Sequence, residues 1–110
     1  SSGGGGLRDL FAERERLLMS AYQPKDYTGE GYLFACSEDG ANALLYYNGA
    51  AHLLRIGEEI LESGMPAIGV HSATTILFEG DYLYACAPDS VCAVNLQNAE
   101  VSSQLSFGVG

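Results

Sequence analysis

The sequence predicts an α/β (α+β) domain, with helices on one face of a single five-stranded antiparallel sheet. Two stretches of helical periodicity support the prediction, one over residues 7–21 and one over residues 50–63. The other apolar stretches are short, rich in β-branched and aromatic residues, and bounded by turn residues. The expected order of elements is α-β-β-α-β-β-β, which suits helices that cover one face of an antiparallel sheet.

The chain has 110 residues, which fits one small domain at residues 7–110 with a core over 31–100. Residues 1–6, SSGGGG, have the composition of a flexible linker or tail. Apolar residues make up 47% of the chain, which is enough for a buried core. No apolar run reaches the roughly 18 residues that a membrane span needs, so we expect no membrane insertion.

The first predicted element is a helix over residues 7–21. Arg, Glu, Leu and Met are strong helix formers, and Pro24 closes the segment. The apolar side chains recur at helical spacing between charged ones: Leu7, Leu10, Phe11, Leu17, Leu18 and Ala21.

A hairpin is predicted next. GYLFACSEDG, residues 31–40, reads as a strand followed by an acidic turn that ends in Gly40. Tyr32, Phe34 and Cys36 would share one face of this strand. ANALLYY, residues 41–47, supplies the second strand.

Residues 48–64 allow two interpretations. Asn48-Gly49 between apolar runs is a strong hairpin signal, which would make AAHLLRI a third strand. The alternative is a helix over 50–63 that ends at Ser63-Gly64 before Pro66. The helix is favoured because five residues form one apolar stripe: Leu53, Leu54, Gly57, Ile60 and Leu61.

The rest of the chain predicts three strands and their turns. They are HSATTILFE (71–79), YLYACA (82–87) and VCAVNLQ (91–97), separated by Gly80-Asp81 and by Pro88-Asp89-Ser90. Residues 101–110 add either an edge strand or a tail.

Two stretches nearly repeat each other fifty positions apart, GYLFACSEDG at 31–40 and DYLYACAPDS at 81–90. We interpret them as two strands of one sheet that place equivalent side chains on one face. The equivalent residues are Tyr32, Phe34 and Cys36 in the first stretch and Tyr82, Tyr84 and Cys86 in the second.

The charge of the chain is strongly acidic and unevenly placed. The net charge is −9, with +1 in residues 1–25 and −10 in residues 26–110. Such a surface repels phosphate, so nucleic acid and anionic lipid are not expected as partners.

No motif indicates catalysis, a cofactor or a metal. Cys36, Cys86 and Cys92 lie in apolar segments, which favours reduced thiols in an intracellular protein. No cation flanks them to activate a nucleophile beside His52 or His71. Structural zinc sites bring cysteines in close pairs such as CxxC, which this sequence lacks. We therefore expect a protein that is not an enzyme and has no cofactor, no metal site and no catalytic residue.

The order of predicted elements resembles the roadblock family of small profilin-like and longin-like domains, such as the short subunits of the Ragulator scaffold. GYLFACSEDGANALLYY (31–47) looks like its first hairpin, and AAHLLRIGEEILESG (50–64) looks like its central helix. TTILFEGDYLYACAPDSVCAVNLQNAE (74–100) is similar to its closing three-stranded meander.

The resemblance implies a non-enzymatic scaffold or adaptor that pairs as a homo- or heterodimer through its sheet edge and central helix. It also implies service as a platform for small GTPases or for motor cargo, in the cytoplasm or at an organelle surface within a complex. The expected partner faces are residues 73–79 and 50–63. Within them we single out Leu53, Leu54, Ile60, Leu61, Thr74, Thr75, Ile76 and Leu77.

Two alternatives stay open. FEGDYLYACAPDSVCAVNLQNAEV and ALLYYNGAAHLLRI also look like parts of β-propeller blades, and the fifty-residue offset lies in the range of blade periods. The chain would then be a propeller fragment that acts as a protein-interaction module. The acidity and small size also fit a secretion chaperone.

Overall fold

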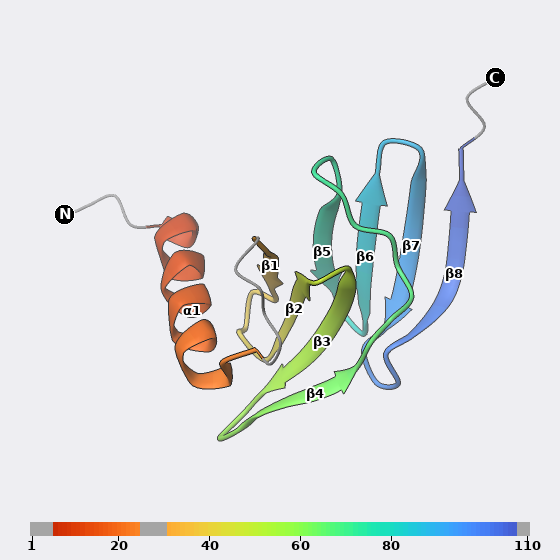
Figure 1. The fold of residues 1–110 in the computed structure, drawn as a ribbon. Helices are drawn as coiled ribbons and strands as arrows, with labels where there is room; N and C mark the ends of the chain where they lie inside the picture. Colours follow the sequence, from red (N-terminus) through yellow and green to blue (C-terminus); the bar gives the residue numbers. More distant parts are fainter. Residues whose placement is uncertain (1–5, 25–30, 108–110) are drawn as a thin grey trace.

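Strands dominate the fold. The computed structural model describes residues 6–24 and 31–107 (Figure 1). Their elements are α1 (Gly6–Tyr22), β1 (Leu33–Cys36), β2 (Asn42–Tyr47), β3 (Ala50–Ile56), β4 (Ile60–Gly64), β5 (Thr75–Glu79), β6 (Tyr82–Ala87), β7 (Ser90–Asn95) and β8 (Glu100–Ser106). The predicted α/β class is therefore wrong, because the described part of the chain is mostly β.

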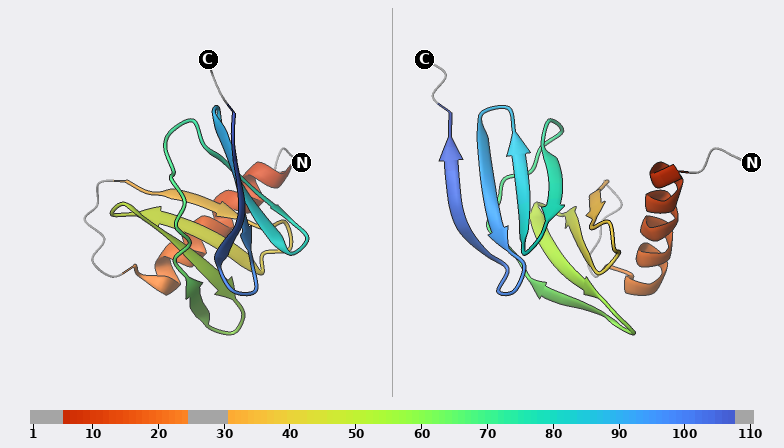
Figure 2. Two further views of the ribbon diagram at one scale, coloured as in Figure 1. Left: turned by 90° about the vertical axis from the view of Figure 1, so that its right-hand side faces the viewer. Right: turned by 180° about the vertical axis from the view of Figure 1, so that it is seen from behind.

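The strands form two separate sheets instead of the single five-stranded sheet that the sequence predicted. Sheet 1 has the order β1-β2-β3-β4, and sheet 2 has the order β5-β6-β7-β8. All neighbouring strands are antiparallel. Figure 2 shows the two sheets stacked face to face, with α1 on the other side of sheet 1.

The helix predicted over residues 50–63 is replaced by β3 and β4. Asn48 and Gly49 have φ angles of 52° and 79°, so they form the left-handed two-residue turn that joins β2 to β3. Both faces of β3 are covered, with Ala51 and Leu53 toward sheet 2 and Leu54 toward α1. A strand that is buried on both faces carries a continuous apolar run. The apolar residues of that run also fit the spacing of an amphipathic helix, which is why the sequence favoured a helix here.

Other elements agree with the sequence. The helix expected at 7–21 is α1, which extends slightly further at each end. The strand expected at residues 82–87 is β6, and β2 lies within the predicted 41–47. Of the two options for residues 101–110, the edge strand is observed as β8 up to Ser106.

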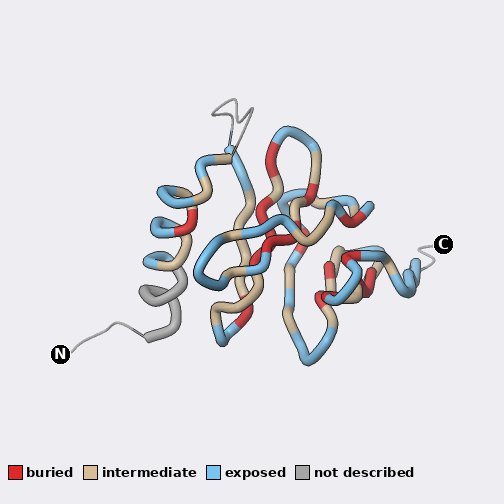
Figure 3. The backbone as a smooth tube through the Cα atoms, turned by 90° about the horizontal axis from the view of Figure 1, so that it is seen from below, coloured by how far each residue is buried: buried red, intermediate tan, exposed pale blue. Residues whose placement is uncertain are grey.

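The main core lies between the two sheets. It is built from buried residues of both: Leu44, Ala51, Leu53, Leu83, Ala85, Cys92, Val94, Leu96 and Ala99. A second cluster joins α1 to the other face of sheet 1, through Leu18, Ala43, Leu45, Tyr47 and Leu54. Figure 3 shows buried segments along the strands of both sheets and at one point on α1, with exposed segments between them.

The last three strands of the two sheets repeat each other at an offset of forty positions, and the first strands, β1 and β5, begin at residues 33 and 75. β2 and β6 begin at residues 42 and 82, β3 and β7 at 50 and 90, and β4 and β8 at 60 and 100. The register shifts between Leu53 and Leu54 in sheet 1 and between Ala93 and Val94 in sheet 2, at the same offset. These shared irregularities indicate one structural unit used twice.

The fifty-residue similarity is not this repeat. Residues 33–36 form the first strand of sheet 1, whereas residues 82–87 form the second strand of sheet 2. Phe34 and Cys36 pack in the cluster beneath α1, but Tyr84 and Cys86 lie on the other sheet. The expectation that both sets share one face of one sheet is wrong. The resemblance arises because both are short strands of alternating side chains.

Residues 65–74 connect the two sheets. They lead from β4, the last strand of sheet 1, to β5, the first strand of sheet 2 (Figure 1). Pro66 and Thr74 of this segment are buried, and Ile68 packs against the main core. Stacked four-stranded meanders joined from last strand to first strand are the arrangement of neighbouring β-propeller blades.

Candidate functional site

The outermost surface of sheet 2 is the candidate site. We call the face of each sheet that is turned toward α1 its near face, and the opposite one its far face. Cross-strand pairs identify the far face of sheet 2, because residues directly opposite each other point the same way. The pairs run Leu77–Tyr84–Ala93 and Cys86–Val91–Leu105 across the sheet. Their chain neighbours Leu83, Ala85, Cys92 and Val94 point into the core.

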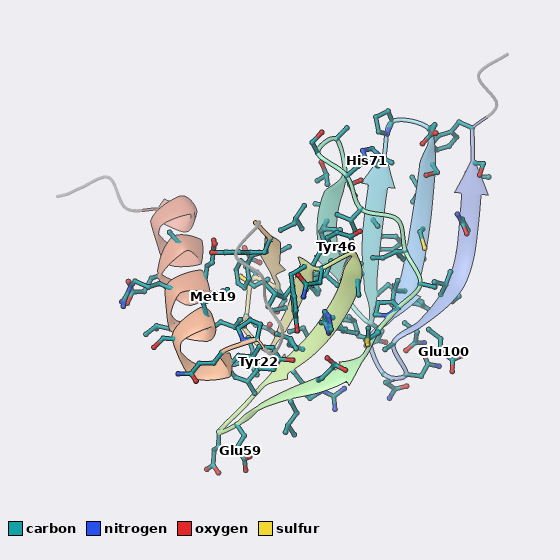
Figure 4. All side chains as sticks on the ribbon, viewed as in Figure 1. Met19, Tyr22, Tyr46, Glu59, His71 and Glu100 are labelled. Atoms are coloured by element: carbon teal, nitrogen blue, oxygen red, sulfur yellow. The ribbon has the colours of Figure 1, made fainter. Side chains whose placement is uncertain are left out.

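In the described part of the chain, the middle of this far face is mostly apolar and partly exposed, with polar residues around it: Thr75, Glu79, Asn95, Glu100 and Ser103. Leu77 on β5 and Leu105 on β8 are 53% and 59% exposed. The rings of Tyr82 and Tyr84 lie between these outer strands, with centroids 6.2 Å apart. The carboxylates of the face stand at one end, where Glu100 begins β8 (Figure 4). An exposed apolar surface of this kind marks an interaction site more often than an inert one.

The internal repeat relates the open face to a buried one. The offset of forty positions converts Leu44 into Tyr84 and Ala51 into Val91, and the strands correspond in the same way. Leu44 and Ala51 lie on the far face of sheet 1 and are 0% and 3% exposed, because sheet 2 covers them. The same face of the repeat is therefore covered in sheet 1 and uncovered in sheet 2.

At the other end of the stack, α1 covers the near face of sheet 1. Leu18 is 3% exposed and is the anchor of the helix in this contact. The Arg14 guanidinium donates hydrogen bonds to the carbonyl oxygens of Ser37 and Glu38, at 3.1 and 2.8 Å. A groove of about 660 Å³ remains between the helix and the sheet, lined partly by Leu17 and Ile56.

A polar cluster ties the end of α1 to sheet 1. His52 Nδ1 on β3 lies 2.7 Å from Glu62 Oε1 on β4, and the His52 ring stacks on Tyr47 at 4.4 Å between centroids. The Tyr22 hydroxyl of α1 donates to the same Glu62 oxygen over 3.5 Å. Burial raises the pKa of Tyr22, and the negative charge of Glu62 adds to the rise. In Figure 4, Tyr22 points from the helix toward the sheet.

The three cysteines and His71 lie outside this polar cluster. All three thiols are free, and burial raises the pKa of Cys92, which disfavours its thiolate. His71 Nδ1 accepts a hydrogen bond from the backbone N–H of Ala73 at 3.3 Å. Within residues 6–24 and 31–107, no group of three or more His, Cys, Asp or Glu side chains is placed to hold a metal ion. No helix in that part of the chain is long and apolar enough to cross a membrane.

The predicted partner residues are dispersed in the structure. Leu53 and Leu54 are fully buried in β3, and Thr74 is buried before β5. Ile60 packs beneath α1, Ile76 packs against the main core, and Leu61 is 59% exposed on β4. The structure brings only Thr75 and Leu77 of the set onto the far face of sheet 2.

Sequence reasoning missed the other members of the face. They are Tyr82, Tyr84, Cys86, Val91, Ala93 and Leu105, together with the polar residues Glu79, Asn95, Glu100 and Ser103. Their alternation with core residues is visible in the sequence, since YLYACA and SVCAVN place every second side chain on one face. Periodicity alone does not say which of the two faces lies open.

Comparison with known proteins returns no relative. No family model matches the chain, and no curated protein or solved structure is significantly similar to it.

Proposed function

We propose that this chain is a non-catalytic protein-interaction module that receives a further four-stranded antiparallel sheet on the far face of sheet 2. The repeat is the observation that supports the proposal most. The equivalent face of sheet 1 is already covered by such a sheet. The molecule therefore already contains an example of the kind of sheet that would fit the open face.

The chemistry of the face suits a buried contact. Leu77 and Leu105 flank a centre that contains Tyr84, Val91 and Ala93. Burying a leucine side chain stabilises an association by about 1.5–3 kcal/mol before the entropic cost of binding. This apolar centre can be dehydrated without burying a charge, which would be strongly unfavourable.

A sheet is the partner that fits best, because the interface between sheets 1 and 2 shows what such a face accepts. There, leucine and alanine side chains of sheet 1 meet Leu83, Ala85 and Val94 from the near face of sheet 2. Two stacked blades do not close a propeller ring, and rings of this kind contain about 4–8 blades. Of the functions expected from the sequence, we therefore favour the propeller-type interaction module.

The adaptor hypothesis changes in one respect. Dimerisation through a central helix at residues 50–63 is not proposed again, because those residues form β3 and β4. The far face of sheet 2 takes the place of that surface. Small GTPases or motor cargo as partners, a secretion-chaperone role and a cytoplasmic location remain predictions. Three free cysteines suit a reducing compartment.

A tandem variant tests the proposal. Residues 65–107 are repeated once after Gly110, so that the added segment supplies a third four-stranded sheet and its connection. We expect this sheet to cover the original far face. Iodoacetamide should then label the half-buried Cys86 of the original sheet more slowly than in the natural chain, as read by peptide mass spectrometry.

The matched control is the same tandem chain with Leu77→Asp in the original sheet, because Leu77 is 53% exposed in the natural chain. A carboxylate on the face should prevent stacking and restore the labelling rate of Cys86. Equal labelling of Cys86 in the natural chain and in the tandem chain would contradict the proposal.

A further inference from the structure

We propose that α1 is a displaceable cap, and that the near face of sheet 1, once α1 has left, binds the far face of sheet 2 from a second copy of this chain. The inference rests on the proposed function, because it uses the same far face. It adds the identity of the partner and a device that controls access. The product would be a head-to-tail assembly of identical chains.

The near face that α1 covers has a counterpart that already binds a far face. The offset that relates the two sheets converts Ala43, Leu45 and Leu54 into Leu83, Ala85 and Val94. The first three residues lie beneath α1, and the last three pack against the far face of sheet 1. One molecule thus contains both halves of a sheet-to-sheet contact, one half open and the other beneath the helix.

The cover that α1 provides is partial. In the described side chains of α1, residues 12–22, Leu18 is the one buried residue. Leu17 beside it is 53% exposed, and the groove of about 660 Å³ runs between the helix and the sheet. A second four-stranded sheet would contact this face as sheet 2 contacts the far face of sheet 1, where the buried residues come from the two central strands, β2 and β3. Exchange of α1 for a sheet would therefore bury more apolar surface.

Polar contacts at the rim hold the cap. Arg14 binds two backbone carbonyl oxygens of the β1–β2 turn, the Tyr22 hydroxyl contacts Glu62 at 3.5 Å, and the Tyr32 hydroxyl donates to Glu15 of the helix. These contacts lie at least partly in solvent, where each contributes little. Among the described side chains of α1, the apolar contact consists of buried Leu18 with the partly buried Met19 and Tyr22. A cap held in this way can leave without unfolding the core between the sheets, because that core is built from residues of the strands and their connections.

The geometry also sets the kind of assembly. Two different faces meet in a head-to-tail contact, so the chains close into a ring or grow as an open stack. Propeller rings contain about 4–8 blades, so two to four copies of a two-sheet chain would close one.

The experiment removes the cap in the full chain with Leu18→Pro. Proline breaks the helix interior and removes the buried anchor, whereas Leu18→Met preserves both and serves as the control. We expect light scattering to give the mass of one chain for the natural and Leu18→Met proteins. The Leu18→Pro protein should rise to about two to four times that mass. A Leu18→Pro protein that stays at the mass of one chain over the same concentrations overturns the inference.

Specificity is tested by blocking the far face. Leu77→Asp adds a charge to an exposed position of that face. In the Leu18→Pro background it should return the mass to one chain, and association that persists would also overturn the inference, because it would be nonspecific. The doubly substituted chain keeps a free near face and should form a 1:1 complex with the natural chain, whose far face is open.

The two proposals fail separately. If the tandem variant protects Cys86 but the Leu18→Pro protein stays single, the far face binds a sheet and α1 is not a displaceable cap. If the tandem variant gives no protection, the far face itself is not a docking surface.

Discussion

Sheets 1 and 2 have the same strand order and the same bulge, but their surroundings differ. Within residues 6–24 and 31–107, sheet 1 is covered on both faces, by α1 and by sheet 2, whereas sheet 2 is covered on one face. Leu44 is fully buried in sheet 1, and its equivalent Tyr84 is half-buried in sheet 2. The residue types follow this difference, because tyrosine tolerates a surface that is partly wet. For this pair of equivalent positions, burial follows the place of the sheet in the stack.

The largest expected effect comes from truncating equivalent residues of the two far faces. Leu44→Ala should reduce the free energy of unfolding by about 2–5 kcal/mol, because it opens a cavity in the core. Tyr84→Ala should reduce it by about 1 kcal/mol or less, as is usual for substitutions near the surface. Urea denaturation of both variants measures the pair. Equal losses would mean that the far face of sheet 2 is already covered in solution.

A somewhat smaller effect is expected at a close contact between the end of β4 and the residue before β8. A Cβ added at Gly64 of β4 would lie 2.5 Å from the Cβ of Ala99, which directly precedes β8. Gly64→Ala should therefore destabilise the stack by about 1–3 kcal/mol. Ala99→Gly should restore much of the loss, since it removes the opposing methyl group at a residue with φ of 60°. A thermodynamic double-mutant cycle measures the coupling, and additive effects would contradict this account.

The contact between α1 and sheet 1 should respond to alkaline pH. Because the folded-state pKa of Tyr22 is raised, mainly by burial and then by Glu62 and Tyr47, folding favours the protonated phenol. This stabilisation is complete below the ordinary tyrosine pKa of about 10 and is lost as pH rises through the raised value. Tyr22→Phe should abolish this alkaline component and change stability at neutral pH by at most about 1 kcal/mol. Melting temperatures between pH 8 and pH 12 provide the measurement, and identical alkaline profiles would contradict it.

The smallest expected effect on stability comes from an aspartate in the first turn of sheet 1, compared with an aspartate in the first turn of sheet 2. Asp39 Oδ1 accepts hydrogen bonds from the Ser37 hydroxyl and the Ala41 N–H, and these lower the pKa of Asp39. Its stabilisation of the β1–β2 turn is present above the ordinary aspartate pKa and is lost as pH falls through the lowered value. Asp39→Asn should slightly lower the melting temperature at pH 7 and remove this part of the acid dependence. Asp81→Asn, in the two-residue turn of sheet 2, is the matched control.

Local signals in the sequence were sufficient for several elements. The apolar spacing of α1 with Pro24 after it, and the turn at Gly80-Asp81 before β6, gave elements close to those observed. The Asn48-Gly49 turn was also visible, but the apolar residues after it favoured the wrong element. Those residues fill both faces of β3, and the identity of the covering layers is a tertiary property that β3 itself does not encode.

The repeat and the candidate site could not be obtained in the same way. At the offset of forty positions that the structure shows, Leu44 corresponds to Tyr84 and Ala51 to Val91. Equivalent positions of the two sheets therefore carry different residue types. At the offset of fifty positions the residue types are similar although the strands are not equivalent, because short alternating strands are built from few residue types. Only the stacking of the sheets shows that the near face of sheet 2 belongs to the core and that its far face is exposed.

The connection at residues 65–74 has a consequence for how such a chain could evolve. It links the last strand of one unit to the first strand of the next, so that a single stretch of gene encodes one sheet together with its link. Duplication of that stretch would add a layer without redesigning any existing contact. Because α1 blocks one end of the stack, growth by duplication would proceed in one direction, beyond β8.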